Sequence, residues 1–527
     1  MHQLRTLWPW YVAMFAAYPL LYIAVTNPGQ VTAMDVLPVV IAGVAAALAL
    51  VMLLRLFMGN WAAVGLAATW CVFLFYLYGP VNVWWFNWVR AGLEQRAVEP
   101  AWYNAHPQLV HSIAWVLIAL AGIARIRRVA PRISQAATGA LNLVALLLAA
   151  LVIVQGSANL AREGRAGPKP SQAAKAIAGK GAAGDPDIYF ILLDGYARAD
   201  VLEQYYDFDN SHFLDRLRNL GFQVSNASRS NFYWTDESVG SALNLDYIQV
   251  LMNGPIDTVS RDRTELYRLL RDNRASQFLR ARGYRYVQLQ SSWGGTASNP
   301  FADEFLPCYT GPFGNEYLRA VADASWLRAL GSQASIDVAN CHLRNFDTLS
   351  AQAKVPGPKF VFAHFVLPHH PYLFDRDGNV LRRATISDQF EFQKRLWEDR
   401  KSYADQLVYV NRRIGTVVER LIADSPRPPV ILLISDHGPN LRKGMTGPEQ
   451  HHVRLSNLTA MYLPGAPAGY LPADATPVNH LRRVFNLYFD AGLPILPDRY
   501  FVSSFLFPLK LDEVGLDNKM LPVQPGF

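Results

Sequence analysis

An acid–imidazole pair follows an apolar run late in the chain. The segment 429–440 reads PVILLISDHGPN, so Asp436 and His437 come one residue after five consecutive branched aliphatic residues. Such a run is typical of a strand that is buried on both faces of a parallel sheet. A carboxylate and an imidazole at the end of that strand could bind a metal ion, whereas a polar turn is the alternative interpretation.

Two other apolar runs end in residues of the same kinds. Asp194 directly follows IYFILL, His364 lies near the end of FVFAHFVL, and His369 and His370 come just after that run. A single acid after a strand usually belongs to a turn or caps a helix. Three such strand ends together favour one metal site, because the carboxyl ends of parallel strands meet at one edge of a sheet.

A threonine stands at the start of an expected helix. The segment SNFYWTDESVGSALN places Thr235 before the helix, with Asp236 and Glu237 in its first turn. One interpretation is a plain N-cap threonine. The other is a nucleophile at a helix N-terminus, where backbone amides favour an anionic ester, and Ser238 is the second candidate for this role.

The region from residue 187 onward contains the elements that must position these residues. Strand patterns alternate with helix patterns, which predicts an α/β domain whose mainly parallel central sheet is covered on both faces. The expected strands are IYFILL, FQVSN, YRYVQLQ, KFVFAHFVL and VILLIS. The expected helices include NSHFLDRLRNLG, with an Asn cap and a Gly stop, and the long amphipathic SYADQLVYVNRRIGTVVERLIADS.

The first 156 residues are far more apolar than the rest of a chain that is 51% hydrophobic and 17% charged. A membrane-spanning helix needs roughly 20 apolar residues. Five stretches are expected to span a membrane as a transmembrane domain: Trp8–Thr26, Val36–Leu54, Trp61–Val81, Leu109–Ala124 and Ala136–Gln155. A cleaved signal peptide is not indicated, because several apolar stretches follow the first.

The positions of the arginines predict how these stretches are oriented. Arg5, Arg55 and a group of four arginines at 125–132 lie in segments that alternate with loops of weak or balanced charge. The positive-inside rule then predicts a cytoplasmic N-terminus and an outer C-terminal domain. The aromatic run WWFNWVRAG after the third stretch indicates either a helix at the outer interface or an extension of that stretch.

The remaining segments complete the expected organisation. A linker rich in Gly, Ala, Ser and Lys is expected at 157–186, and the outer domain at 187–527. The net charge of +7 comes without a basic run interleaved with aromatic residues, so no nucleic-acid partner is expected. Cys308 and Cys341 both fall on the predicted outer side, where a disulfide between them is favoured over two free thiols.

The order of these motifs resembles the alkaline phosphatase/sulfatase superfamily, and within it the membrane-anchored branch of lipoteichoic acid synthases and lipid A phosphoethanolamine transferases. The motifs are YFILLDGYAR, SNFYWTDESVGSALN, HFVLPHHPY and ISDHG, followed by LSNLTAMYLPG and TPVNHLRRVFNLYF. The resemblance covers Asp187 to about Tyr500. It implies an alkaline-phosphatase/sulfatase-like fold.

The resemblance also implies roles for particular residues. Asp194, Asp436 and His437 would hold a divalent metal, with Thr235 as both the fourth ligand and the catalytic nucleophile. A bound cation favours the threonine alkoxide, and this ligand set suits zinc or manganese, with magnesium as a third option.

Histidines matching the family's histidine-rich strand end would bind substrate or assist the leaving group. These are His364 and His369, with His370 as a substitute for His369. His451 and His452 follow the DHG motif, where the phosphoethanolamine transferases carry a further histidine. They would bind a second metal or substrate, or else lie in solvent.

Two departures from the family bear on the reaction. The chain has no C/S-x-P-x-R motif of the kind that sulfatases convert to formylglycine, which speaks against sulfate-ester hydrolysis by the usual mechanism. The lipoteichoic acid synthases place a glutamate where Asp194 stands, which weakens a match to that activity.

These observations lead to one favoured function and two alternatives. The favoured function is a transferase that moves a phosphoethanolamine or phosphoglycerol head group from a membrane phospholipid to an envelope glycan or lipid through a phosphothreonine. The alternatives are a phosphate or sulfate ester hydrolase, and a non-catalytic membrane protein on a degenerate enzyme fold. The expected location is a bacterial inner membrane, with the catalytic domain periplasmic or extracellular. The sequence does not indicate an oligomeric state.

Overall fold

The computed structural model describes residues 8–27, 31, 33–94, 107–129, 132, 135–165, 185–252, 256–310, 316–381, 397–441 and 443–522. The chain divides into two compact units. The first comprises residues 1–167, 315–335 and 383–387, and the second comprises 168–314, 336–382 and 388–527. Most of the expected linker, and Arg5 of the expected N-terminal tail, lie outside the described residues.

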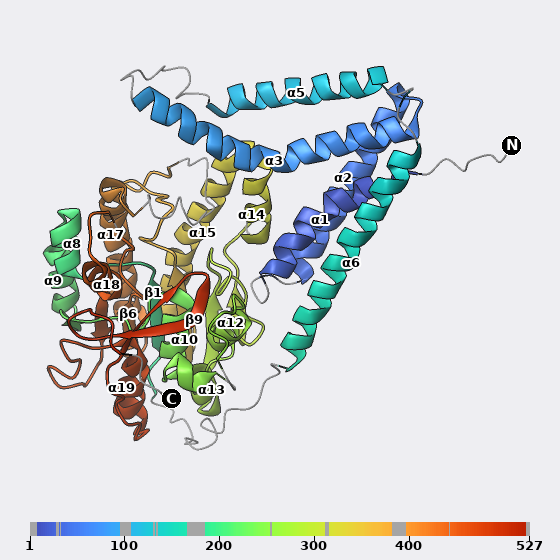
Figure 1. The fold of residues 1–527 in the computed structure, drawn as a ribbon. Coiled ribbons are helices and arrows are strands. Elements are labelled where there is room, and N and C mark those ends of the chain that lie inside the picture. The colour runs from blue at the N-terminus through green and yellow to red at the C-terminus, as the bar shows by residue number, and fades with distance from the viewer. Residues whose placement is uncertain are drawn as a thin grey trace. The chain divides into compact units, whose positions relative to one another are not determined.

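Apolar helices dominate the first unit, as expected. They are α1 (Tyr11–Thr26), α2 (Ala33–Phe57), α3 (Trp61–Glu94), α5 (Pro107–Val129) and α6 (Gln135–Arg165), drawn in blue to teal in Figure 1. Among the residues that the structure describes, three helices are long and apolar enough to cross a membrane, namely Ala33–Phe57, Trp61–Asn82 and Ala136–Asn159, whereas α1 is apolar but shorter. Large aliphatic side chains such as Leu56 and Ile153 are exposed on these helices, which suits contact with lipid.

Helix α3 continues through the aromatic run that follows the third apolar stretch. It contains Pro80 and extends to Glu94 without interruption. Trp84 and Trp85 therefore lie on the same helix as Trp61. The structure matches an extension of the third stretch and not a separate interfacial helix.

A short excursion from the α/β region belongs to the first unit. Residues 315–335 contain α14 (Glu316–Ala324) and the 3-10 helix η3 (Trp326–Leu330). Tyr317 and Val321 of α14 are buried in a cluster with Leu20 and Val36, and the Tyr317 hydroxyl donates to the Leu20 carbonyl oxygen at 2.9 Å. The excursion is thus packed into the helical unit.

Polar contacts hold the second half of the same excursion. The Arg328 guanidinium donates from Nε to Asn82 Oδ1 at 3.2 Å, and Asn82 Nδ2 lies 2.7 Å from His111 Nδ1. A glycine is also required at position 79 of α3, because a Cβ there would lie 2.2 Å from the carbonyl oxygen of Asp323 in α14. The backbones of α3 and the excursion therefore approach closely.

A seven-stranded sheet forms the centre of the second unit. Its strands are β1 (Ile188–Leu193), β2 (Phe222–Ser225), β3 (Arg285–Leu289), β4 (Glu304–Leu306), β5 (Lys359–Phe365), β6 (Val430–Ile434) and β7 (Thr459–Tyr462). The strand order is β2-β7-β6-β1-β5-β3-β4. Strands β6, β1, β5, β3 and β4 are parallel, and β7 is antiparallel to both of its neighbours. The predicted α/β fold with a mainly parallel sheet is confirmed.

Helices cover the sheet, and a hairpin follows it. The helices are α8 (Ala199–Tyr206), α9 (Ser211–Asn219), α10 (Thr235–Asn244), α11 (Ile248–Leu251), α12 (Thr264–Arg271), α13 (Arg274–Ala281), α15 (Gly331–Ala351), η4 (Gln352–Lys354), α17 (Arg400–Asp424), α18 (Gly447–Leu455) and α19 (Pro477–Phe489). The hairpin consists of β8 (Tyr500–Ser504) and β9 (Phe507–Val514).

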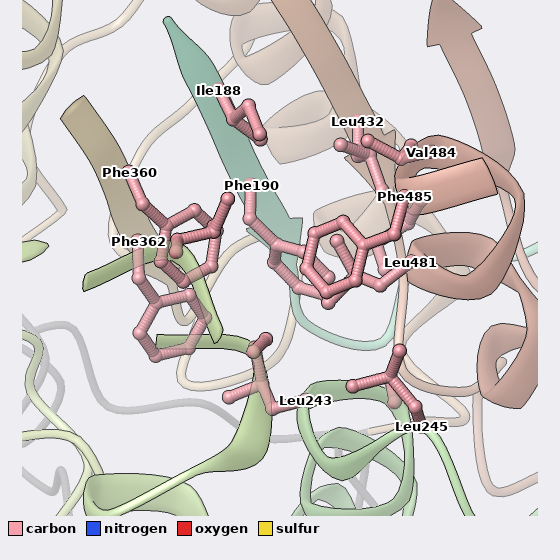
Figure 2. Close-up of a cluster of buried hydrophobic side chains, with 14 of the residues drawn as sticks. Ile188, Phe190, Leu243, Leu245, Phe360, Phe362, Leu432, Leu481, Val484 and Phe485 are labelled. Carbon is pink, nitrogen blue, oxygen red and sulfur yellow. The ribbon is translucent and has the colours of Figure 1, made fainter. Parts of the chain in front are cut away.

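The core of this unit follows from the two-residue period of the strands. Ile188 and Phe190 of β1 lie on one face together with Phe360 and Phe362 of β5, in a cluster that also includes Phe485 of α19 (Figure 2). The same cluster includes side chains of α10, α12 and α13. On the opposite face, the Phe346 ring of α15 stacks on Phe365 at 4.5 Å between centroids. Both faces of the sheet are therefore buried, which explains its near-continuous apolar strands.

One helix cap differs from its prediction. Asn210 precedes α9 but makes no side-chain cap hydrogen bond. Its Nδ2 donates instead to the Tyr196 hydroxyl at 3.0 Å, and its Oδ1 accepts from Asn411 at 2.9 Å. Tertiary partners thus take the side chain away from the helix terminus.

The predicted disulfide between Cys308 and Cys341 is present. It closes the loop from which the excursion 315–335 departs, and both sulfur atoms belong to buried residues. A bridge between residues 33 positions apart is expected to stabilise the folded unit by roughly 3–4 kcal/mol, because it lowers the entropy of the unfolded chain.

We therefore expect replacement of both cysteines by alanine to lower the free energy of unfolding by roughly 3–4 kcal/mol. Urea unfolding with and without dithiothreitol measures this loss, and Cys71→Ser serves as the control because Cys71 is unbridged. The reductant should destabilise the wild type and the control alike but leave the double variant unchanged. Equal stability of all three proteins in reductant-free buffer would contradict the prediction.

Candidate metal centre

Two adjacent parallel strands bring the predicted ligands together. Asp194 follows β1 directly, and Asp436 follows the neighbouring β6 after one serine. His437 comes next, and the ligand atoms of these three residues all lie within 4.8 Å of one another. All three side chains are buried. The cluster therefore occupies the carboxyl edge of the sheet, where ligands of such folds bind.

Hydrogen bonds orient the Asp436 carboxylate. Its Oδ1 accepts from the backbone amides of Gly195 at 3.1 Å and His437 at 3.0 Å. Its Oδ2 lies 3.2 Å from His437 Nε2. Within the described part of the chain, Asp436 Oδ2 and Asp194 Oδ1 are buried oxygens without a hydrogen-bond partner. A buried carboxylate oxygen in this state is costly unless a cation accompanies it.

The His437 ring is fixed in the tautomer that a metal ligand needs. Its Nδ1 lies 3.0 Å from the Gly438 carbonyl oxygen, and because a carbonyl only accepts, Nδ1 carries the proton. The lone pair is then on Nε2, which faces the two carboxylates at 3.2 and 3.8 Å. Such a backbone carbonyl partner is typical of metal-binding histidines.

The protonation preferences of the cluster also fit a cation. Burial and the neighbouring Asp194 charge raise the pKa of Asp436 to about 7. Burial raises the pKa of Asp194, but the charges of His369 and the hydrogen bond from His364 outweigh it and hold that pKa well below its usual range. Burial and the nearby Arg454 charge lower the pKa of His437 well below its usual value. A divalent cation would relieve the repulsion between the two carboxylates, so Asp194, Asp436 and His437 fit a metal ion.

Thr235 adjoins this cluster and is the first residue of α10. The cap position belongs to Trp234, so Thr235 is not the N-cap. Its Oγ1 lies 3.3 Å from His437 Nε2, and the residue is only half-buried. The alternative nucleophile, Ser238, is buried and donates to the Asp436 carbonyl oxygen at 2.8 Å. The geometry therefore favours Thr235 as the hydroxyl that can meet both metal and substrate.

The three histidines of the β5 region lie near the cluster in different settings. His364 is buried on β5, with Nε2 3.3 Å from Asp194 Oδ2. The His369 ring lies 6.4 Å from the His437 ring and contacts the Trp397 ring at 4.8 Å. The buried His370 ring lies 4.1 Å from that of His369. Of the three histidines, His364 is close enough to orient the Asp194 carboxylate. The His369 ring lies next to the His437 ring.

The last two predicted histidines make contacts elsewhere. His451 Nδ1 lies 2.9 Å from the Asn518 carbonyl oxygen, and His452 Nε2 lies 3.6 Å from Asp200 Oδ2. Neither belongs to the group whose ligand atoms converge among the described residues. The structure does not bring them together with Asp194 and Asp436.

Sequence analysis missed a segment that supports His364. Thr296 is buried, and its Oγ1 lies 2.8 Å from His364 Nδ1 and 2.6 Å from the Ser291 hydroxyl. The Trp293 ring packs against the His364 ring at 5.7 Å. The signal was present, because this segment follows β3, whose carboxyl end lies beside that of β5.

The two acids after Thr235 are held away from solvent. Asp236 forms a buried ion pair with Arg263, which also donates to the Phe505 carbonyl oxygen. Glu237 accepts from the Ser503 hydroxyl at 2.7 Å, and burial together with the Asp236 charge raises its pKa well above the usual value. These contacts fix the start of α10, and hence Thr235, against the β8–β9 hairpin.

Part of the α/β unit matches a known protein family. Residues 276–480, which include His364, Asp436 and His437, match the family model described as sulfatase. No curated protein matches the chain. Residues 276–480 are therefore similar to the sulfatase family, in agreement with the resemblance found in the sequence motifs.

Similar solved structures include three proteins at low identity. The C-terminal periplasmic domain of EcEptC from Escherichia coli, in complex with Zn, is 12% identical, with 63% of this chain and 93% of that chain covered and a TM-score of 0.42. The integral membrane lipooligosaccharide phosphoethanolamine transferase A from Neisseria meningitidis is 14% identical, with 91% and 94% covered and a TM-score of 0.39. A protein in the alkaline phosphatase superfamily from Vibrio parahaemolyticus is 11% identical, with 66% and 84% covered and a TM-score of 0.37.

Proposed function

We propose that this protein is a membrane-anchored transferase that moves a phosphorylated head group from a phospholipid to an envelope glycan or lipid. The observation that carries the proposal is the half-buried Thr235 hydroxyl, 3.3 Å from His437 Nε2 beside two converging carboxylates. The same chain contains helices long and apolar enough to cross a membrane, which would keep the domain near a lipid donor.

Each residue of the centre has a separate task in this proposal. Asp194, Asp436 and His437 hold a divalent ion, for which zinc or manganese suits the ligand set better than magnesium. That ion, when bound, favours the alkoxide of a ligating hydroxyl and offsets charge on phosphoryl oxygens. Thr235 supplies the attacking oxygen, and the amides at the start of α10 face the anionic group. His369, whose ring lies 6.4 Å from the His437 ring, is assigned to substrate binding.

The transfer takes two balanced steps. In the first, Thr235 Oγ1 forms a bond to phosphorus, the bond from phosphorus to the diacylglycerol oxygen breaks, and that oxygen takes up the proton lost by the threonine. In the second, a hydroxyl oxygen of the acceptor bonds to phosphorus, the bond from phosphorus to Thr235 Oγ1 breaks, and Oγ1 takes up the proton lost by the acceptor hydroxyl. The net reaction exchanges one ester for another without an oxidant or a second cofactor.

The proposed cellular location of the catalytic domain rests on the orientation inferred for the apolar helices. The distribution of arginines supports a cytoplasmic N-terminus and a catalytic domain on the periplasmic or extracellular side of a bacterial inner membrane. The disulfide between Cys308 and Cys341 supports an oxidising compartment for the α/β unit. The donor is then a phospholipid of the outer leaflet.

Intact mass measurement of the purified full-length protein tests the proposal. The protein is incubated with zinc and a total bacterial phospholipid extract, without an acceptor. We expect a mass gain in the wild type that is absent in Thr235→Ala and absent after chelation of the metal. The size of the gain identifies the head group.

Analysis of the released lipid separates transfer from hydrolysis. Diacylglycerol release in proportion to the protein adduct supports the transferase. Continuous release of diacylglycerol together with free phosphorylated head group, and no adduct, would assign the centre to an ester hydrolase instead. An adduct that persists in Thr235→Ala but disappears in Ser238→Ala would identify Ser238, and not Thr235, as the nucleophile.

A further inference from the structure

A buried arginine lies behind the metal centre without any assigned role. Arg454 lies on α18 and is only 2% exposed. It is the largest of the fully buried side chains in the described structure. Burying a guanidinium is costly unless its N–H groups are hydrogen-bonded, so its partners indicate what its position maintains.

The Arg454 guanidinium joins two separate segments of the site. Its Nε donates to the Tyr233 carbonyl oxygen at 2.8 Å, and its Nη1 donates to the Gly438 carbonyl oxygen at 2.9 Å. The centre of the guanidinium lies 4.9 Å from the centroid of the Trp234 ring. One rigid, planar group therefore contacts the segment before Thr235 and the segment after His437.

Both contacted carbonyls are directly connected to functional groups. The Gly438 carbonyl oxygen also accepts from His437 Nδ1 at 3.0 Å, so Arg454 fixes the acceptor that sets the tautomer and orientation of this ligand. The Tyr233 carbonyl lies two residues before Thr235 in an extended stretch that leads into α10. Arg454 thus contacts the backbone next to each of the two groups, Thr235 and His437, whose Oγ1 and Nε2 atoms lie 3.3 Å apart.

The backbone around Gly438 packs closely against the end of α18, so it has little room to shift if Arg454 is replaced. The Gly438 amide donates to the Arg454 carbonyl oxygen at 2.7 Å. A Cβ at Gly438 would lie 2.2 Å from the Val453 carbonyl oxygen and 2.6 Å from that of Ser456. The DHG segment is therefore pressed against the end of α18, and a shift of either one displaces the other.

We infer that Arg454 is a positioning residue that sets the spacing between the Thr235 hydroxyl and the His437 ligand. It is not part of the group of converging ligands and acts through the Tyr233 and Gly438 carbonyls. The inference rests on the proposed metal centre and not on the identity of the transferred group. A lysine at this position keeps the charge but loses the rigid fork that bonds two carbonyls at once.

The chain offers a matched control for this arginine. Arg482 is also buried, at 8% exposed, and it donates to two backbone carbonyls, those of Leu245 and Pro494, each at 2.7 Å. The Leu245 carbonyl lies at the C-terminal end of α10, the opposite end from Thr235, and neither carbonyl is bonded to a residue beside Asp194, Asp436 or His437. Arg482→Met thus removes a guanidinium with the same kind of partners from another buried position, and it measures the structural cost of losing such an arginine.

The test measures zinc affinity of the full-length protein in detergent by competition with a chromogenic chelator, without any lipid substrate. We expect Arg454→Met to weaken zinc binding by about 10- to 100-fold, as for other residues that orient metal ligands. Arg454→Lys should lie between Arg454→Met and wild type, and Arg482→Met should match wild type. Cobalt-substituted protein should show a changed absorption spectrum only in the Arg454 variants.

Thermal unfolding of the metal-free proteins separates positioning from stability. Both methionine variants should unfold at lower temperature than wild type, by similar amounts. Equal zinc affinity in wild type and Arg454→Lys, with an unchanged cobalt spectrum, would overturn the inference, as would equal loss of affinity in Arg454→Met and Arg482→Met. A wild type that binds no zinc would instead overturn the proposed centre, and normal zinc binding without head-group transfer would overturn only the proposed reaction.

Discussion

Replacing Thr235 by alanine is expected to lower head-group transfer by about 10³- to 10⁶-fold, the range seen when a covalent nucleophile is removed. The remaining residues can still bind the substrate, but no oxygen is present to receive the phosphoryl group. The fold should survive, because Thr235 is half-buried and its hydroxyl contacts residues of the metal centre and not the hydrophobic core. Single-turnover release of diacylglycerol, with the enzyme in excess over a short-chain phospholipid, measures the loss.

Two variants make the Thr235 prediction specific. Thr235→Ser keeps a hydroxyl at the same backbone position and should retain measurable transfer. Ser238→Ala removes the competing hydroxyl, whose bond to the Asp436 carbonyl oxygen is structural, and should keep the protein adduct. Transfer by Thr235→Ala at a rate similar to Thr235→Ser would show that the nucleophile lies elsewhere.

Replacing Asp436 by asparagine is expected to have opposite effects on the zinc-loaded and metal-free proteins. It removes one of three converging ligands and should abolish tight zinc binding and transfer. In the metal-free protein it removes a buried carboxylate that faces another carboxylate. Burial and the Asp194 charge raise the pKa of Asp436 to about 7 in the folded state, against 3.8 for the free side chain.

The sign of the pH dependence follows from this difference. The folded metal-free protein holds a proton on Asp436 that the unfolded chain has released, so the contribution of Asp436 to stability is full below about pH 4 and is lost as the pH rises through about 7. Asp436→Asn should therefore gain stability relative to metal-free wild type as the pH rises from 5 to 8. The gain is on the order of 2–4 kcal/mol, since one pKa unit corresponds to about 1.4 kcal/mol.

Denaturant unfolding in the presence of a chelator, at several pH values, checks this prediction. Asp347→Asn is the control, because Asp347 is 73% exposed and lies on α15 outside the centre. Its stability relative to wild type should not change over the same range. If Asp436→Asn were less stable than metal-free wild type at pH 8, the two carboxylates would not be in repulsion and the metal centre would lose its main electrostatic support.

Sequence analysis predicted those site residues whose positions are determined by the ends of strands. Asp194 and Asp436 each follow an apolar run, and parallel pairing of β1 with β6 suffices to place them side by side. Thr235 was recognisable from its family motif, and the structure adds its distance to His437. Local sequence pattern is informative here because a buried parallel strand has few alternatives.

The parts that sequence analysis missed depend on contacts between distant segments. Thr296 supports His364 from a position 68 residues away, and Arg454 contacts Tyr233 across 221 residues. Neither residue has a local pattern that distinguishes it from an ordinary loop or helix residue. His451 and His452 show the converse, because their position after the DHG motif suggested ligands, yet α18 directs their contacts to Asn518 and Asp200.

The excursion at residues 315–335 has a practical consequence for dissecting this protein. Tyr317 and Val321 are buried among the membrane-unit helices, so a protease cut in the segment 168–184 would not by itself liberate a soluble catalytic fragment. A recombinant fragment starting at Asp187 would carry α14 stripped of its apolar partners, and such a surface favours aggregation. The Cys308 and Cys341 Cα atoms, however, are only 4.7 Å apart. The disulfide thus holds together the two chain segments that flank the excursion, and a shortened loop within this bridge is the design to test for a soluble catalytic domain.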